Sequence, residues 1–183
     1  MFQVRIHGRG GQGVVTAAEL LSVAAFLEGK HAQAFPSFGS ERMGAPVMAF
    51  CRISSREIRL REPVMEPDAV IIQDSTLIES VNVFQGVINN GCVLINSTTD
   101  ISSTLNIKLV TIKCINATAI AMAHIGRPLP NAVLLGSFAA ITNVVDIESV
   151  VKAIGMQFPR AMAEKNIAAA RDAYTETKSA VAV

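Results

Sequence analysis

The sequence predicts an α/β protein built on an open, mostly parallel sheet flanked by helices. A β-like run at its start leads through a glycine loop into an Ala- and Leu-rich helical stretch. A continuous apolar run at residues 69–73 is typical of a central parallel strand covered on both faces. From Asn116 onward the periodicity is helical. This mixture of strands and helices, followed by helices alone, indicates Rossmann-like geometry with a helical C-terminal third.

Residues 2–46 are expected to form a strand, a helix, a second strand and a long loop. Residues 2–6 alternate and predict a first strand, and residues 14–28 predict the helix after the glycine loop. We expect residues 33–35 to form a short second strand. Residues 36–46 contain two prolines and two glycines, and the length of this loop indicates a function.

A β-hairpin insertion and the remaining elements complete the prediction. Two β-like runs flank Ser54-Ser55-Arg56, at 47–53 and 57–60, and we expect them to pair as a hairpin. After the apolar strand, Asp74 and Ser75 provide caps for a helix that begins near Thr76. Further strands are expected at 91–97 and 108–113. The expected late helices span 117–124, 132–141, 147–158 and 161–177.

Composition limits the classes of protein to which the chain can belong. The 183 residues are 50% hydrophobic and 17% charged, which suits a single domain spanning 1–183. Lys and Arg number 16 against 15 Asp and Glu, so neither nucleic acid nor an anionic membrane is an expected partner. The chain shows no signal-peptide pattern and no apolar run near the roughly 18 residues that span a bilayer, so we expect a cytoplasmic protein. Low charge with abundant Ala and Val also suggests a subunit of a larger assembly.

The cysteines and histidines form no catalytic or metal-binding pattern. Cys51, Cys92 and Cys114 are too far apart in sequence for a disulfide framework, a zinc site or an iron–sulfur cluster. Cys51 lies in a predicted strand and is expected to be a buried small hydrophobe. The three histidines stand apart from any arrangement of Ser, Cys or Asp that marks nucleophilic catalysis. We therefore expect no catalytic residue and no metal ligand in this chain.

The glycine loop at residues 8–13 is the strongest functional signal. Gly8, Gly10 and Gly13 have the G-x-G-x-x-G spacing between a strand and a helix. Glycines let the backbone approach a phosphate, and the first N–H groups of the helix favour an anion. The alternative is that these glycines only allow the helix to pack closely on the strand. Both interpretations stay open on spacing alone.

The residues around the loop favour a phosphate ligand other than NAD. An NAD site needs an acidic residue about 20 positions further on, and residues 30–35 contain none. Arg9 and Gln12 instead add two long polar side chains within the loop. Arg9 is a candidate for a charge-assisted contact to phosphate.

A second block, residues 40–46, offers further candidates. Arg42 is a possible second anion contact, and Gly44 permits close backbone approach. The block can equally be a rigid turn whose charges face water. Asp74 closes the apolar strand at the ligand-bearing edge of the sheet, where we expect it chiefly to cap the following helix.

The two blocks resemble a known family, the gamma subunits of pyruvate and related 2-oxoacid:ferredoxin oxidoreductases. The resemblance rests on residues 7–21 and 35–47, with fainter echoes at 68–74, 131–140 and 164–166. It implies a complex that oxidatively decarboxylates a 2-oxoacid with coenzyme A, giving acyl-CoA, carbon dioxide and reduced ferredoxin. Gly44-Ala45-Pro46 resembles the pyruvate type, whereas Met43 stands where the family often has a basic residue.

The resemblance also implies partners and cofactors. Thiamine diphosphate, Mg2+ and the [4Fe-4S] clusters belong to other subunits of the complex. The partners are alpha, beta and delta chains, with ferredoxin or flavodoxin as electron acceptor. A gamma-type domain helps to hold coenzyme A and packs against the thiamine-binding chains. The candidate coenzyme A contacts in this chain are Gly8, Arg9, Gly10, Gly11, Gln12, Gly13, Ser40, Arg42 and Gly44.

Two other interpretations remain open from the sequence. The chain can be a stand-alone nucleotide-binding module, either regulatory or NAD-dependent. It can also be a purely structural subunit whose glycine loop only packs against its neighbours.

Overall fold

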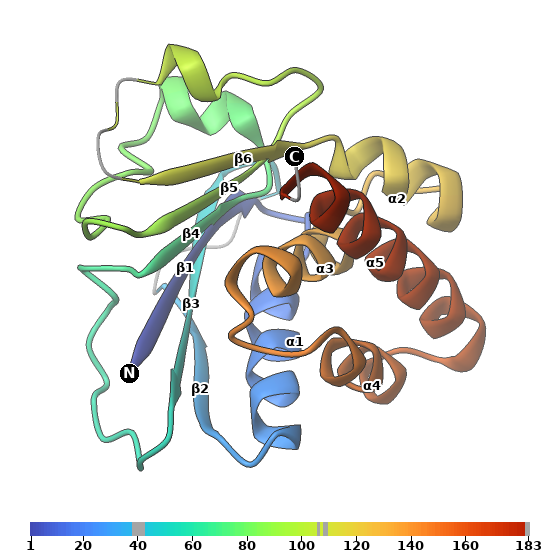
Figure 1. Cartoon of the computed structure of the whole chain (residues 1–183), viewed down its shortest axis with the longest axis horizontal. Helices are drawn as coiled ribbons and strands as arrows, with labels where there is room; N and C mark the ends of the chain where they lie inside the picture. Colours follow the sequence, from blue (N-terminus) through green and yellow to red (C-terminus); the bar gives the residue numbers. More distant parts are fainter. Residues whose placement is uncertain (38–42, 106, 108–109, 182–183) are drawn as a thin grey trace.

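A mixed sheet forms the centre of the molecule (Figure 1). The computed structural model describes residues 1–37, 43–105, 107 and 110–181, and within them the sheet has six strands in the order β2-β3-β1-β4-β5-β6. Strands β1, β4, β5 and β6 are parallel, whereas β3 lies antiparallel between β1 and β2. The strands span β1 Phe2–Arg9, β2 His31–Pro36, β3 Pro46–Ser54, β4 Ala69–Ile72, β5 Cys92–Asn96 and β6 Thr111–Ile115.

The helices lie mainly on one side of this sheet. Figure 1 shows α1, α3, α4 and α5 together beside β1 and β3, with α2 continuing from the end of β6. Two short 3-10 helices, η1 and η2, follow β4 and β5 on the chain. No described helix is both long and apolar enough to cross a membrane. The helices span α1 Val14–Leu27, η1 Ser75–Glu79, η2 Ser102–Thr104, α2 Ala117–Ile125, α3 Asn131–Thr142, α4 Ile147–Gln157 and α5 Arg160–Val181.

The central parallel strand β4 is buried on both faces, as its apolar run predicts. Ile71 packs in the main core with α1, α3 and β1. Val70 and Ile72 face the opposite side and pack with Leu77 of η1 and Val93 of β5. Successive side chains of a strand point to opposite faces, so a strand covered twice has no polar position.

The hairpin joins different strands from those that the sequence predicts. The run at 47–53 belongs to β3, which pairs with β2 in the register Ala34–Cys51 and with β1 in the register Ile6–Ala49. Residues 57–60 form no strand, so the predicted pairing of 47–53 with 57–60 is wrong. The physical reason is burial. The inner residues of β3 pack in the main core under α1, and they can do so because β3 lies inside the sheet, between β1 and β2.

The position of β3 separates β2 from β1. In a dinucleotide-binding fold, the second parallel strand lies directly beside the first and brings its terminal acidic residue to the glycine loop. Here the antiparallel β3 occupies that place. The carboxyl end of β2 is therefore not adjacent to the loop, in agreement with the lack of a carboxylate there.

The other predicted elements are close to those observed. All four late helices are present as α2 to α5, with small changes at their ends. The helix expected near Thr76 is the short η1, and Asp74 caps it by accepting a hydrogen bond from the Thr76 N–H at 3.1 Å. The strand expected at 108–113 is β6, Thr111–Ile115, and residues 108–109 lie outside the described part of the chain.

Candidate functional site

The glycine loop turns the chain from β1 into α1 and does so with left-handed backbone at two positions. Gly11 has φ +94° and Gly13, the N-cap of α1, has φ +72°. Only glycine adopts such angles without strain. An added Cβ at Gly13 would lie 2.5 Å from Nδ2 of Asn131, and one at Gly8 would lie 2.5 Å from Cγ2 of Val14. Close packing is therefore part of what these glycines do.

The second block lies against the first where it is described. The Gly10 N–H donates to the Ala45 carbonyl at 2.9 Å, and the Gly44 N–H donates to the Gly10 carbonyl at 3.1 Å. Met43 forms an isolated bridge with Gly10, and 86% of its surface is exposed. Ser40 and Arg42 lie outside the described residues. The structure thus brings Gly44 to the glycine loop.

Arg9 is the centre of a polar clasp formed by Arg9, Gln12, Gly44, Asp74 and Thr76. Its Nε pairs with Asp74 Oδ2 at 3.1 Å, its Nη1 donates to the Gly44 carbonyl at 3.1 Å and its Nη2 donates to Thr76 Oγ1 at 2.8 Å. Gln12 accepts from the Arg9 N–H at 2.7 Å and donates to Asp74 Oδ2 at 3.1 Å. Two of the five guanidinium N–H donors have no partner in this clasp.

Asp74 remains ionised because of these contacts. Its burial alone would raise the pKa of the carboxyl group. Hydrogen bonds from Thr76 and Gln12, together with the charge of Arg9, outweigh burial and hold the pKa of Asp74 below its ordinary value. Asp74 therefore caps η1, as predicted, and also fixes Arg9 at the mouth of the loop.

A cavity of about 300 Å³ opens beside the glycine loop at the start of α1. Its lining includes Arg9 and the first turn of the helix, where backbone N–H groups have no partner within the helix. The first bond within the helix runs from the Ala17 N–H to the Gly13 carbonyl at 2.9 Å. Such a cavity can hold an anion against N–H donors and one cation. It is lined by Arg9, Gly10, Gly11, Gly13, Val14, Val15, Thr16 and Val47.

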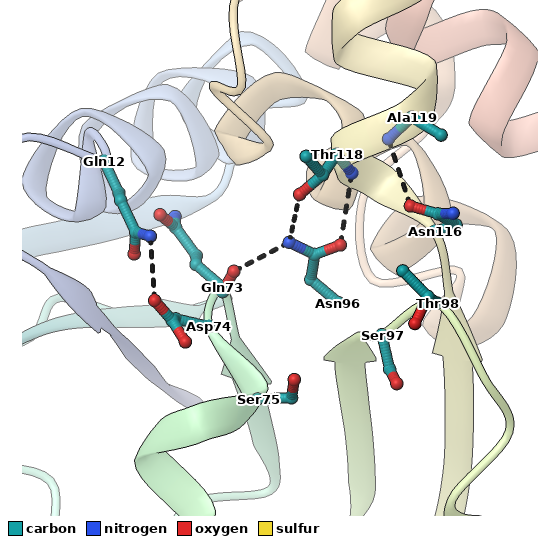
Figure 2. Close-up of a pocket in the computed structure, with 10 residues that line it drawn as sticks. All are labelled: Gln12, Gln73, Asp74, Ser75, Asn96, Ser97, Thr98, Asn116, Thr118 and Ala119. Carbon is teal, nitrogen blue, oxygen red and sulfur yellow. Dashed lines mark hydrogen bonds between the residues drawn. The ribbon is translucent and has the colours of Figure 1, made fainter.

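A second cavity, of about 390 Å³, lies at the carboxyl ends of β4, β5 and β6 (Figure 2). Asn96 ties this edge together: its Nδ2 donates to the Gln73 carbonyl and to Thr118 Oγ1, both at 2.8 Å, and its Oδ1 accepts from the Thr118 N–H at 3.1 Å. Asn116 caps α2 by accepting from the Ala119 N–H at 3.1 Å. These amides were not among the residues predicted from the sequence, although each one directly follows or closes a β-like apolar run.

On the face of β1 opposite the main core, Arg5 and His7 form a buried pair that was not predicted from the sequence. Arg5 Nε donates to His7 Nε2 at 3.0 Å, and Arg5 Nη2 donates to the Val83 carbonyl at 3.1 Å. Burial, followed by the charge of Arg5, lowers the pKa of His7 to about 4. This pair fastens the segment after β4 to the sheet.

Cys51 is buried, as the sequence predicts. Cys51 is fully buried in β3, and burial raises its pKa to about 12. Among the described residues, no group of three or more His, Cys, Asp or Glu side chains is placed to hold a metal ion.

The sequence is similar to those of a known protein family and of several of its members. The sequence matches the family described as pyruvate ferredoxin/flavodoxin oxidoreductase over residues 3–176. The pyruvate synthase subunit PorC of Methanothermobacter marburgensis is 49% identical, with 97% of this chain and 98% of that protein aligned. The common gamma subunit of the pyruvate/ketoisovalerate oxidoreductases of Pyrococcus furiosus is 45% identical over 97% of this chain and 98% of its own length.

Solved structures of oxoacid oxidoreductases are also similar to this chain. Pyruvate oxidoreductase subunit PORC from Thermotoga maritima is similar with a TM-score of 0.81 and 36% identity, covering 95% of both chains. A 2-oxoglutarate:ferredoxin oxidoreductase from Magnetococcus marinus, solved with 2-oxoglutarate, coenzyme A and succinyl-CoA, has a TM-score of 0.81 at 16% identity. It covers 97% of this chain and 31% of that one, so it shows a shared fold alone.

Proposed function

The chain belongs to the pyruvate ferredoxin/flavodoxin oxidoreductase family as a gamma-type subunit, and from this premise we propose that its glycine loop holds the phosphate end of coenzyme A. The chain is one subunit of an oxidoreductase complex and is not catalytic alone. The proposal treats residues 1–183 as a single gamma-type domain of a cytoplasmic complex. Pyruvate is the proposed 2-oxoacid, since Gly44-Ala45-Pro46 resembles the pyruvate type and relatives are named pyruvate synthase subunits.

The observation that supports the proposal is the cavity at the start of α1. It combines the free N–H groups of a helix N-terminus with Arg9, whose guanidinium is held by Asp74 and uses three of its five N–H donors in the described clasp. Phosphate groups prefer this combination of donors. The 2-oxoglutarate:ferredoxin oxidoreductase that shares this fold was solved with coenzyme A, which makes that ligand the natural candidate.

Partner chains supply the rest of the chemistry in this proposal. We assign thiamine diphosphate, Mg2+ and the [4Fe-4S] clusters to the alpha, beta and delta chains, with ferredoxin or flavodoxin as the acceptor. Holding coenzyme A at the subunit contact places its thiol near the reacting centre. Such positioning can lower a bimolecular barrier by about 7 kcal/mol or more in favourable cases.

Replacing Arg9 in the assembled complex tests the proposal. Arg9→Ala removes a charge-assisted contact, and we expect the apparent coenzyme A requirement to rise about tenfold or more. Pyruvate-dependent formation of the thiamine adduct should persist, because it precedes the coenzyme A step. Thr76→Val serves as a matched control, since it removes one hydrogen bond to Arg9 and keeps the charge. Arg160→Ala, at a side chain that is 93% exposed, controls for loss of a surface charge.

Coenzyme A kinetics unchanged by Arg9→Ala would contradict this placement. An equal effect in Thr76→Val would show that loop geometry, not the charge, is responsible. The specific observation that favours a second function is that Arg9 is already bound to Asp74, Thr76 and Gly44, as in a structural clasp. If Arg9→Ala disrupts assembly and leaves coenzyme A affinity intact, the chain is a purely structural subunit.

A further inference from the structure

Gln73, directly after β4, has a buried side-chain amide with no hydrogen-bond partner among the described residues. The residue is 1% exposed, and both Nε2 and Oε1 are buried and unpaired. Its backbone is satisfied: the N–H donates to the His7 carbonyl and the carbonyl accepts from Asn96 Nδ2, both at 2.8 Å. Buried polar groups in folded proteins almost always have a partner, and an unpaired one needs an explanation, of which a bound molecule that supplies the partner is one.

The neighbouring amides point their hydrogen bonds to other groups and do not supply that partner. Figure 2 shows the Gln73 side chain between Gln12 and Asn96 at the second cavity. Both atoms of the Asn96 amide are bonded to Thr118, and both atoms of the Gln12 amide are bonded to Arg9 and Asp74. Gln12 and Gln73 also meet at Gly8, where an added Cβ would lie 3.1 Å from Gln12 Oε1 and 3.3 Å from Gln73 Cβ.

The charge of the cavity limits what it can bind. No Lys or Arg is among its lining residues, and its single carboxylate, Asp74, is already bonded to Arg9, Gln12 and Thr76. Asn116 and the start of α2 add further polar surface without charge. Because the one carboxylate that lines the cavity is paired with Arg9, the unpaired amide suits an uncharged group that carries a donor and an acceptor side by side.

We propose that Gln73 binds such a group, a carboxamide or a nucleobase edge, through a paired donor and acceptor contact in the second cavity. The inference rests on the proposed function. Coenzyme A carries both chemistries, in the amides of its pantetheine arm and in the edge of its adenine, which glutamine amides pair with in two hydrogen bonds. Gln12 lines this cavity, and Gly11 and Gly13 line the anion cavity, so one loop borders both.

The test uses Gln73→Met in the assembled complex, because Met keeps the length of the side chain and removes its hydrogen-bonding atoms. Inhibition by adenosine 3′,5′-bisphosphate and by pantetheine, each in competition with coenzyme A, separates the two sources. We expect the inhibition constant of one probe to rise about tenfold, the loss typical of a paired hydrogen bond. A rise for the bisphosphate alone assigns the adenine edge, and a rise for pantetheine alone assigns an amide.

Gln33→Met is the matched control, since Gln33 also has a buried, unpaired Oε1 but lies on β2, away from the second cavity. It should leave both inhibition constants within twofold of the wild type. If Gln73→Met fails to assemble, Gln73→Leu replaces it. If both inhibition constants of the Gln73 variant stay within twofold of the wild type, the inference is overturned. The Gln73 amide then binds only a trapped water. If Arg9→Ala raises the coenzyme A requirement at the same time, the anion site stands and only this inference fails.

Discussion

Gly136 lies in the middle of α3, where the backbones of α3 and α5 are in direct contact. A Cβ added at Gly136 would lie 2.0 Å from the carbonyl oxygen of Ala170 and 2.8 Å from its carbonyl carbon. No rotamer change can relieve a contact with backbone. Gly136→Ala must therefore push the two helices apart, and next to it the buried hydrogen bond from Thr177 to Ser137, 3.0 Å long, would be stretched.

The expected cost follows from two opposing terms. Alanine in place of glycine stabilises a helix interior by about 0.5–1 kcal/mol. Forcing an extra carbon into a packed core costs about 1–3 kcal/mol, and weakening a buried hydrogen bond adds about 1 kcal/mol. The net loss is about 1–3 kcal/mol, which lowers Tm by roughly 2–12 °C in a chain of this length.

Gly155 in α4 provides the same substitution with the opposite sign. Nothing lies within 4 Å of a Cβ added there, so Gly155→Ala should stabilise the chain by about 0.5 kcal/mol. Urea unfolding followed by far-UV circular dichroism measures both variants against the wild type. A Gly136→Ala variant as stable as Gly155→Ala would refute the close contact between α3 and α5.

Two further predictions concern buried titratable groups. The pKa of His7 falls from its ordinary 6.5 to about 4 in the folded chain, so unfolded chains bind the proton first as the pH decreases. His7 therefore contributes stability above about pH 6.5 that is lost between pH 6.5 and about 4, and the urea midpoint of the wild type should fall more over this window than that of His7→Gln. Equal pH dependence in both would contradict the buried neutral imidazole. Cys51, with its pKa raised to about 12 by burial, should react with iodoacetamide at pH 8 only after unfolding, as peptide mass spectrometry would reveal. Rapid labelling of the native chain would show that β3 opens.

Much of the fold could be predicted because its signals are local. The apolar run at 69–73 is a strand buried on both faces, and the late helices follow from periodicity. The choice of strand partner is not local. Ile58 and Leu60 read as β-like, yet only the run ending at Ile53 has an inner face that α1 and its neighbours bury.

Part of the candidate site could also be predicted from local sequence, and part of it could not. The glycine loop could be found from spacing and context alone. The bond between Arg9 and Asp74, which are 65 residues apart, exists because β1 and β4 are parallel neighbours. Gln73 and Asn96 likewise meet only because β4 lies beside β5, so the sequence shows two separate amides and not a shared edge.

The central place of β1 determines when the glycine loop can take shape during synthesis. Phe2–Arg9 is synthesised before the other strands of the sheet, yet its two neighbours end at Ser54 and Ile72. At about 5–20 residues per second, roughly 3–13 s pass between the end of β1 and the end of β4. Throughout that interval Val4 and Ile6 have no β4 to pair with, so the nascent chain exposes apolar surface that a chaperone can hold.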